Sequence, residues 1–216
     1  MARLDGKVWM VPFTVPGDEV EAMAVRSRPS LVEGRMTRLV SSGPNRVEPP
    51  CPWFGRCGGC HLQHLDSRVQ AHHKAAVLID TFRRIAHLDL TVSRVITGDP
   101  FGYRSRIELH AAAEGVGFFA GQSHRIVPIE ACMIAQPMLS EAIVPLRCAM
   151  RETGMGPLCT VELVAAGSGD MVAVGRCATN RPDRLLAALM ALPGVRGAAA
   201  GRPGQWQEWG DLEISW

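Results

Sequence analysis

Three cysteines in a short glycine-rich segment constrain this chain more than any other feature. They stand in CPWFGRCGGCHLQHL, with five residues between Cys51 and Cys57 and two between Cys57 and Cys60. A two-residue gap lets both thiolates reach one metal site, and Gly58 and Gly59 let the backbone turn tightly with amide N–H groups aimed at sulfur. The spacing therefore predicts a metal centre.

The other cysteines do not suggest a disulfide framework. The chain has seven cysteines, an odd number that is unevenly spread, and its start, MARLDGKVWMV, lacks the apolar core of a secretory signal. Cys148, Cys159 and Cys177 have apolar neighbours, as small core residues do, so none is expected to be a nucleophile. No apolar run is long enough to span a bilayer, and we expect a cytoplasmic protein.

Two residues compete to be the fourth ligand. Cys132, far along the chain, would complete an all-thiolate site of the kind that holds an iron–sulfur cluster. His64 would instead complete a Cys3His zinc site, and such modules also bind RNA. The spacing leaves both metals open.

The distribution of charge gives a weaker indication, that of a surface which attracts phosphate. The formal net charge is +2, but residues 51–110 hold a surplus of Lys and Arg and most of the histidines. Histidines gain charge below neutral pH, and cations attract phosphate. On charge alone, a solvated face explains this surplus.

The pattern along the chain predicts an α+β protein that begins with a small β-barrel. Alternating strands at 7–11, 19–25 and 33–39 form a sheet too short to stand without closure or a covering neighbour. The segment 41–50, SSGPNRVEPP, has the composition of a linker. We predict three parts: a barrel at 1–45, a cysteine segment at 46–66 and an α+β domain at 67–216.

The third part combines helices with a mostly antiparallel sheet. Ser67 caps a helix that runs to about His87. Alternation from Tyr103 onward places Arg104 and Arg106 on one face of a strand. The remaining strands are predicted at 116–120, 125–129, 159–165, 171–177, 195–200 and 212–216, and the remaining helices at 138–153 and 182–192.

Several of these segments together resemble a known family. NRVEPP, the cysteine run, GYRSRIELH and IEACMIAQP, which contains Cys132, are similar to the bacterial iron–sulfur RNA (uracil-5-)-methyltransferases, S-adenosylmethionine-dependent enzymes that include those making 5-methyluridine in 23S rRNA. The resemblance implies that Cys51, Cys57, Cys60 and Cys132 hold a 4Fe-4S cluster. It also implies that residues 1–45 form a TRAM-like RNA-binding barrel.

The resemblance further implies a structured RNA partner, with rRNA favoured over tRNA. Arg104, Arg106, His61, Gln63 and His64 are the candidate RNA contacts, because phosphate and unpaired bases are held by such side chains. The cluster is expected to shape the RNA-binding surface rather than to carry electrons. A zinc Cys3His RNA-binding module without enzymatic activity and a ferredoxin-like electron carrier are the alternatives.

The family's catalytic apparatus is not visible in the sequence. No strand, glycine-rich turn and helix follow one another with the spacing of an S-adenosylmethionine loop, and the glycines at 194, 197, 201 and 204 read as loop residues. We therefore expect the S-adenosylmethionine domain to be absent and the chain to be inactive alone. Trp206, Trp209 and Trp216 are expected to cover the sheet or to pack against that domain.

Overall fold

The computed structural model describes residues 1–112, 115–152, 159–167, 169–177 and 181–214. It divides into two compact units, Met1–Gly55 with Cys60–Thr97 and Arg56–Gly59 with Gly98–Trp216. Helix α1 (Ser67–Thr81) groups with the N-terminal sheet in the first unit. Among the described residues, no helix has both the length and the apolar character needed to cross a membrane.

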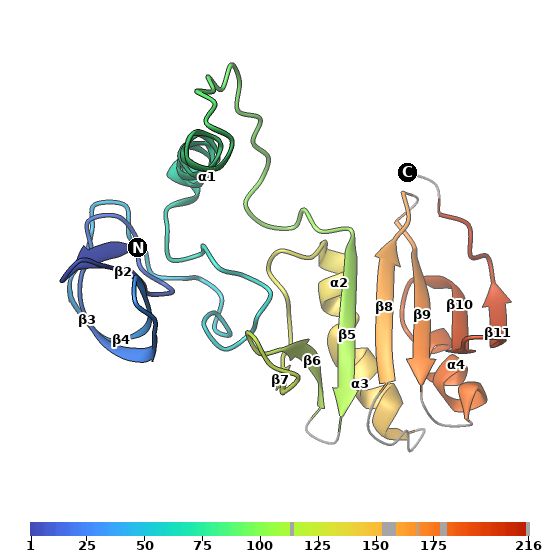
Figure 1. Ribbon diagram of the computed structural model, residues 1–216. Coiled ribbons are helices and arrows are strands. Elements are labelled where there is room, and N and C mark those ends of the chain that lie inside the picture. The colour runs from blue at the N-terminus through green and yellow to red at the C-terminus, as the bar shows by residue number, and fades with distance from the viewer. Residues whose placement is uncertain (113–114, 153–158, 168, 178–180, 215–216) are drawn as a thin grey trace. The chain divides into compact units, whose positions relative to one another are not determined.

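The sheet of the first unit has four strands in the order β1-β2-β4-β3 (Figure 1). Its strands are β1 (Ala2–Leu4), β2 (Lys7–Met10), β3 (Glu19–Ser27) and β4 (Leu31–Ser41). Asp5 and Gly6 connect β1 to β2 with φ of 49° and 73°, as a two-residue hairpin turn requires. The strand β1 was not predicted.

The barrel expected at residues 1–45 is not closed. Strand β2 pairs with β4 in parallel, which leaves β1 at one edge, and β3 pairs antiparallel with β4 at the other. Register shifts between β3 and β4 interrupt their ladder, but no described strand joins β3 to β1. The first unit is therefore built on an open sheet.

The helix predicted from Ser67 to about His87 is confirmed, but its predicted cap is wrong, because Asp66 is the capping residue and Ser67 is the first residue of the helix. The Asp66 carboxylate accepts a hydrogen bond from the Arg68 N–H and caps α1, which continues as a π-helical turn, η1 (Phe82–Ala86). His87 ends it with φ of 55°, in the left-handed region. No side chain of α1 or η1 is buried among the described residues.

The second unit contains a seven-stranded sheet in the order β11-β10-β9-β8-β5-β6-β7. Within the described residues of this sheet only β9 and β10 pair in parallel, so the expected mostly antiparallel sheet is confirmed. Its strands are β5 (Arg106–Ala112), β6 (Gly115–Phe119), β7 (Ile126–Pro128), β8 (Cys159–Ala165), β9 (Met171–Cys177), β10 (Val195–Arg202) and β11 (Gln205–Gly210).

Three helices cover one face of this sheet (Figure 1). They are α2 (Pro137–Glu141), α3 (Ile143–Glu152) and α4 (Pro182–Met190). Leu109 and Leu163 from the sheet and Leu146 and Leu185 from the helices are fully buried. A Cβ atom at Gly175 would lie 2.5 Å from the Leu185 Cδ2 atom, so glycine permits the close approach of α4 to β9. Two layers thus enclose the main hydrophobic core.

Three predicted boundaries are wrong. The helix predicted at 138–153 breaks at Ala142, because Pro145 has no N–H to donate to the Glu141 carbonyl; residue 153 lies outside the described residues. The strand predicted from Tyr103 begins at Arg106, and Arg104 forms only an isolated bridge to Ala135.

The third correction concerns the strand predicted at 212–216. The last strand among the described residues is β11, which pairs with β10 from Arg202↔Gln205 onward, and Gly204 turns the chain between them with φ of 83°. Residues 212–214 are irregular, and residues 215 and 216 lie outside the described part of the chain. The glycine that was read as a loop residue therefore marks a hairpin.

Candidate functional site

A backbone clasp in the first unit ties together the two ends of the cysteine segment. Arg46 and Leu65 form an antiparallel bridge, and the Val47 N–H donates to the His64 carbonyl at 3.0 Å. Cys51 precedes and Cys60 follows the part of the loop that belongs to the other unit. The clasp therefore fixes the chain just outside both cysteines.

The Arg46 side chain anchors this clasp to the N-terminal sheet. Its guanidinium donates to both carboxylate oxygens of Asp18, at 2.7 to 3.1 Å, and to the Phe13 carbonyl at 2.6 Å. The two side chains are only 14% and 1% exposed, and the hydrogen bonds from Arg46 hold the pKa of Asp18 well below its usual range. The pair is a bidentate connection, with a buried carboxylate, between the residue before β3 and the cysteine segment.

His64 packs inside this region. It is 2% exposed, its Nε2 lies 3.3 Å from the Thr14 carbonyl oxygen, and its ring lies 5.5 Å from that of Phe54 and 6.0 Å from that of Phe13. Burial lowers its pKa, which favours the neutral ring. Its Nδ1 is buried without a hydrogen-bond partner among the described residues.

The two neighbouring candidate RNA contacts differ from His64 in exposure. His61 is exposed, whereas Gln63 is half-buried, and its Oε1 lacks a hydrogen-bond partner in the described part of the chain. Exposure therefore falls from His61 through Gln63 to the buried His64.

The second unit holds Cys57 and Cys132. Cys57 forms a bridge with Ala120, and the Gly58 N–H donates to the Phe119 carbonyl at 2.9 Å. A Cβ atom at position 58 would lie 2.9 Å from that carbonyl oxygen, so glycine is required for this contact. The Cys132 N–H donates to the Ser140 Oγ at 2.9 Å. Each cysteine is thus fixed by its backbone.

The donor chemistry of these cysteines fits an iron–sulfur cluster. Cys51, Cys57, Cys60 and Cys132 are all half-buried, and the Gly59 N–H donates to the Cys57 Sγ at 3.4 Å, as amides do around cluster sulfurs. Among the described residues, no three His, Cys, Asp or Glu side chains lie close enough together to hold a metal ion. The ligand set remains a prediction.

Arg104 and Arg106 lie in different surroundings. Arg106 is exposed on β5 and forms an ion pair with Glu162 of β8. Arg104 is also exposed, its backbone is hydrogen-bonded to Ile134 and Gln136, and it forms no ion pair in the described part of the chain. Both side chains are accessible to a ligand.

The sequence did not single out an aromatic cluster on the same sheet. The rings of His110 and Phe119 stack with centroids 3.7 Å apart and planes at 11°, and His124 meets Phe119 edge-on at 5.2 Å. The alternation in GYRSRIELH places His110 on the face of Arg106, but Phe119 joins it only through the pairing of β5 with β6.

The remaining cysteines do not form a nucleophilic site. Cys159 and Cys177 lie opposite each other on β8 and β9, both are buried, and their Sγ atoms are 2.6 Å apart. Burial raises the pKa of Cys159 to about 12, so its thiol stays protonated. Cys148 was expected in the core but is exposed, because it lies on the outer side of α3.

Comparison with curated proteins shows that this chain is similar to one class of enzymes, the RNA uracil-C5 methyltransferases. Over about 80% of its residues the chain is homologous to part of such enzymes, which confirms the resemblance found in the sequence. The relatives include 23S rRNA (uracil(1939)-C(5))-methyltransferase RlmD of Pectobacterium atrosepticum, 34% identical over 179 residues, and that of Chromohalobacter salexigens, 35% identical over 175 residues.

A third relative, RlmD of Shewanella sp. (strain W3-18-1), is 31% identical over 199 residues. The three alignments cover 80%, 78% and 88% of this chain but 40%, 37% and 44% of the relatives. The chain thus spans about two fifths of the length of the curated relatives it matches. No protein-family model matches it.

Proposed function

We propose that this chain is the RNA-binding part of a uracil-C5 RNA methyltransferase that forms 5-methyluridine in rRNA in the cytoplasm. The observation that carries the proposal is the 31–35% identity, over most of the chain, to proteins named as 23S rRNA uracil-C5 methyltransferases. The open N-terminal sheet takes the role of the TRAM-like RNA-binding element. Ribosomal RNA is the partner rather than tRNA.

In this proposal, Cys51, Cys57, Cys60 and Cys132 hold a 4Fe-4S cluster. When bound, the cluster would supply a structural cross-link among four thiolates rather than redox chemistry. The anchored Gly58 turn and the Arg46 clasp support this role, because both fix the backbone next to a cysteine. His64 is then a positioning residue that packs beneath the clasp and does not ligate the metal.

The proposed RNA contacts are Arg104 and Arg106 of the second unit and His61 and Gln63 of the first, where the buried His64 packs against Phe54. The exposed arginines are suited to phosphate, and His61 is exposed beside the cysteine segment of the first unit. Phosphate contacts release counterions, so affinity for RNA should fall steeply as salt rises.

Methyl transfer is proposed to need the part of the relatives that this chain does not cover. With S-adenosylmethionine and unmodified 23S rRNA, we expect no 5-methyluridine from this chain alone, measured by nucleoside mass spectrometry. Methylation above the level without protein would contradict this expectation.

One observation favours a second candidate, a zinc Cys3His RNA-binding module. The His64 Nδ1 has no partner among the described residues while Nε2 faces the Thr14 carbonyl, so a lone pair on Nδ1 is free to ligate zinc. Cys132→Ala and His64→Ala separate the two candidates. Loss of metal in the cysteine variant alone supports the cluster, whereas loss in the histidine variant alone supports zinc.

The function itself is tested by RNA binding. The chain, purified without oxygen, is titrated into a labelled fragment of 23S rRNA at 50 and 200 mM salt, with double-stranded DNA as the control. We expect tighter binding to RNA and a loss of at least about tenfold across this salt range if two or more phosphates are contacted. Equal affinity for DNA would contradict the proposal.

A further inference from the structure

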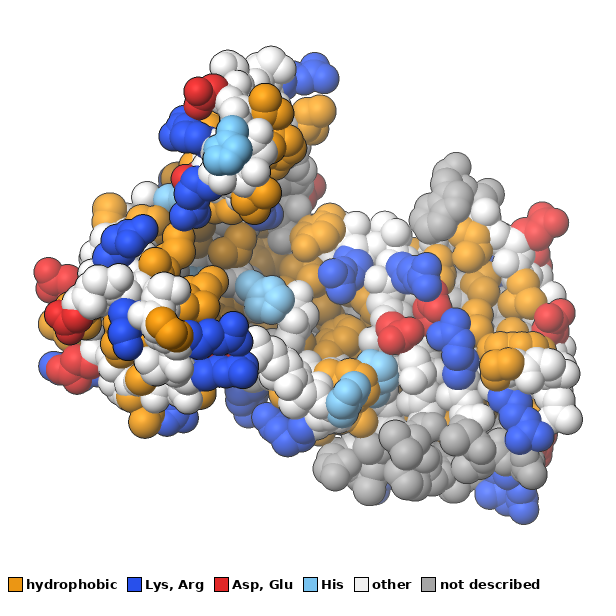
Figure 2. All heavy atoms as spheres, in the orientation of Figure 1, with side chains coloured by type: hydrophobic (Ala, Val, Ile, Leu, Met, Phe, Trp, Pro, Cys, Tyr) orange, Lys and Arg blue, Asp and Glu red, His pale blue; other side chains and the backbone are white. Residues whose placement is uncertain are grey.

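The sheet of the second unit has one face that no described helix covers. Helices α2 to α4 pack on the opposite face (Figure 1), whereas Arg106, Glu108 and His110 of β5 alternate onto the uncovered one. Figure 2 shows basic, acidic and histidine side chains gathered over the central strands on this side. The face is therefore polar at its centre.

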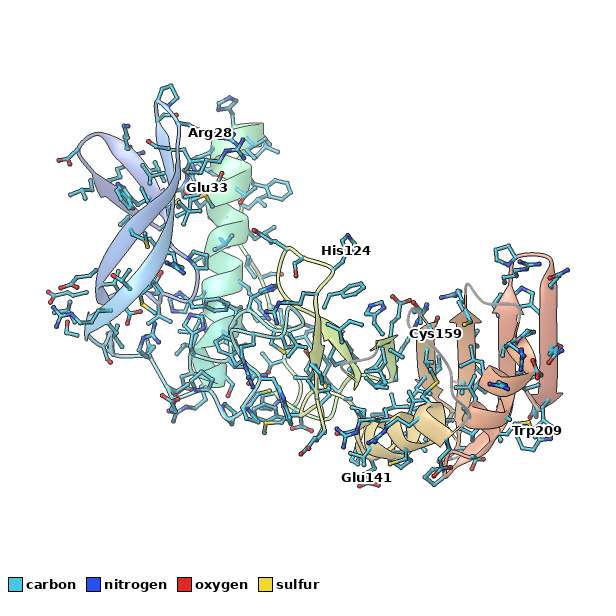
Figure 3. The ribbon with its side chains drawn as sticks, turned by 90° about the horizontal axis from the view of Figure 1, so that it is seen from below. Arg28, Glu33, His124, Glu141, Cys159 and Trp209 are labelled. Carbon is cyan, nitrogen blue, oxygen red and sulfur yellow. The ribbon has the colours of Figure 1, made fainter. Side chains whose placement is uncertain are left out.

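An aromatic platform lies at the β6 side of this face and consists of His110, Phe119 and His124. The stacked pair His110–Phe119 and the edge-on His124 come from β5, the end of β6 and the following turn. His124 is exposed, and Figure 3 shows it on the side of the sheet away from Glu141 of α2. The platform thus presents ring surface to solvent.

The platform is fixed by its surroundings. The His110 Nδ1 lies 3.4 Å from the Thr160 Oγ1, and its Nε2 lies 3.8 Å from the Glu108 carboxylate. The Ala120 N–H donates to the Arg125 carbonyl at 2.8 Å and closes the turn that carries His124. A ring held in place loses little conformational freedom when a ligand stacks on it.

The charges beside the platform favour an anionic ligand. Glu108 and Glu162 stand directly opposite on β5 and β8, but Arg176 bridges them at 3.7 and 3.6 Å, and Arg106 also pairs with Glu162. The two carboxylates are thereby neutralised. Arg125, next to His124, is exposed and forms no ion pair within the described residues.

We infer that this platform binds an unpaired base of the RNA by stacking, while the exposed Arg125 beside it holds a phosphate. Aromatic rings that are partly open to solvent on an uncovered sheet face suit single-stranded RNA, since every base presents a flat π-surface, whereas the bases of a duplex are stacked on one another. The inference rests on the proposed function and adds to it a preference for single-stranded RNA. It also adds three contact residues, His110, Phe119 and His124.

The test measures fluorescence anisotropy of two labelled probes, an unstructured 20-nucleotide oligoribonucleotide and the same strand paired with its complement. We expect Phe119→Leu to weaken binding of the single strand about tenfold, and His124→Ala about threefold, with little change for the duplex. Phe119→Trp keeps a stacking surface and should retain affinity. Phe101→Leu, at an exposed aromatic outside the platform, is the matched control.

The outcomes are separable. If the unchanged chain binds RNA and both His124→Ala and Phe119→Leu bind the single strand as tightly as Phe101→Leu does, the platform is overturned while the proposed function stands. If the unchanged chain binds neither RNA, the proposed function fails and the platform with it. Because the His124 side chain is exposed, its variant tests the platform even where Phe119→Leu lowers the melting temperature.

Discussion

The two units of the molecule are stabilised in different ways. Among its described residues the first unit buries three hydrophobic side chains, Val15, Val32 and Leu65, whereas the other buried hydrophobic residues lie in the second unit. The first unit is fastened instead by the buried Arg46–Asp18 pair and the packed ring of His64. Few buried apolar contacts mean low local stability, so the unit that carries Cys51 and Cys60 should open first.

The largest effect should come from the core of the second unit. Leu163 is fully buried between the sheet and its helices, so Leu163→Ala removes apolar contacts and leaves a cavity that costs about 4 kcal/mol. Hydrogen exchange should show faster opening in the second unit. Leu88→Ala, at an exposed leucine of the first unit, is the control and should change stability by less than about 0.5 kcal/mol.

The next effect concerns the clasp of the first unit. Arg46→Met leaves the Asp18 carboxylate buried without its cation, and we expect a loss of about 3 kcal/mol, seen by hydrogen exchange in the first unit. Arg38→Met breaks an exposed ion pair with Glu21 on the same sheet and should cost much less. Equal effects of the two variants would show that the clasp does not hold the first unit together.

The same pair gives the first unit a dependence on pH. Because the folded pKa of Asp18 lies below its unfolded value of about 3.9, its contribution to stability is present above that pH and is lost as the pH falls further. Urea unfolding between pH 3 and pH 6 should therefore show the first unit weakening below about pH 4. Asp18→Asn should flatten this dependence, and an unchanged slope would contradict the assignment.

A smaller effect is expected on the uncovered face of the second sheet. Arg176→Met leaves Glu108 and Glu162 facing each other without the arginine that bridges them, which should cost about 1 kcal/mol. Added salt should reduce the loss, because screening weakens the repulsion between carboxylates. A loss that does not respond to salt would point to packing instead.

The smallest effect is chemical rather than energetic. In the native protein Cys148 is exposed, whereas Cys159 is buried with its pKa raised to about 12. Iodoacetamide at pH 8 should therefore label Cys148 rapidly and Cys159 only on unfolding, as read by peptide mass spectrometry. Rapid labelling of Cys159 in the folded protein would contradict its burial.

Much of the second unit could be predicted from the sequence, and less of the first. Strands 159–165 and 171–177 were predicted with the bounds observed, because buried strands between turn signals carry a strong local pattern. Closure of the N-terminal sheet was not predictable, since it depends on which strands pair at its edges. Pro145 and Gly204 carried signals for a helix break and a hairpin that the prediction did not use.

In the candidate site, too, some features were predictable from the local sequence and others depend on tertiary contacts. The cysteine spacing could be read directly, but the burial of His64 follows from its packing against Phe13 and Phe54, which are far apart in the sequence. The aromatic platform needs the pairing of β5 with β6 to join His110 to Phe119. Contacts set by tertiary pairing leave little local signal.

The most direct test of the whole account is the metal content of the chain purified without oxygen. Iron, acid-labile sulfide and zinc are measured per chain, together with the visible spectrum. We expect about four iron and four sulfide per chain, with a brown colour that is lost in Cys132→Ala. A colourless protein with one zinc ion and no sulfide would contradict it.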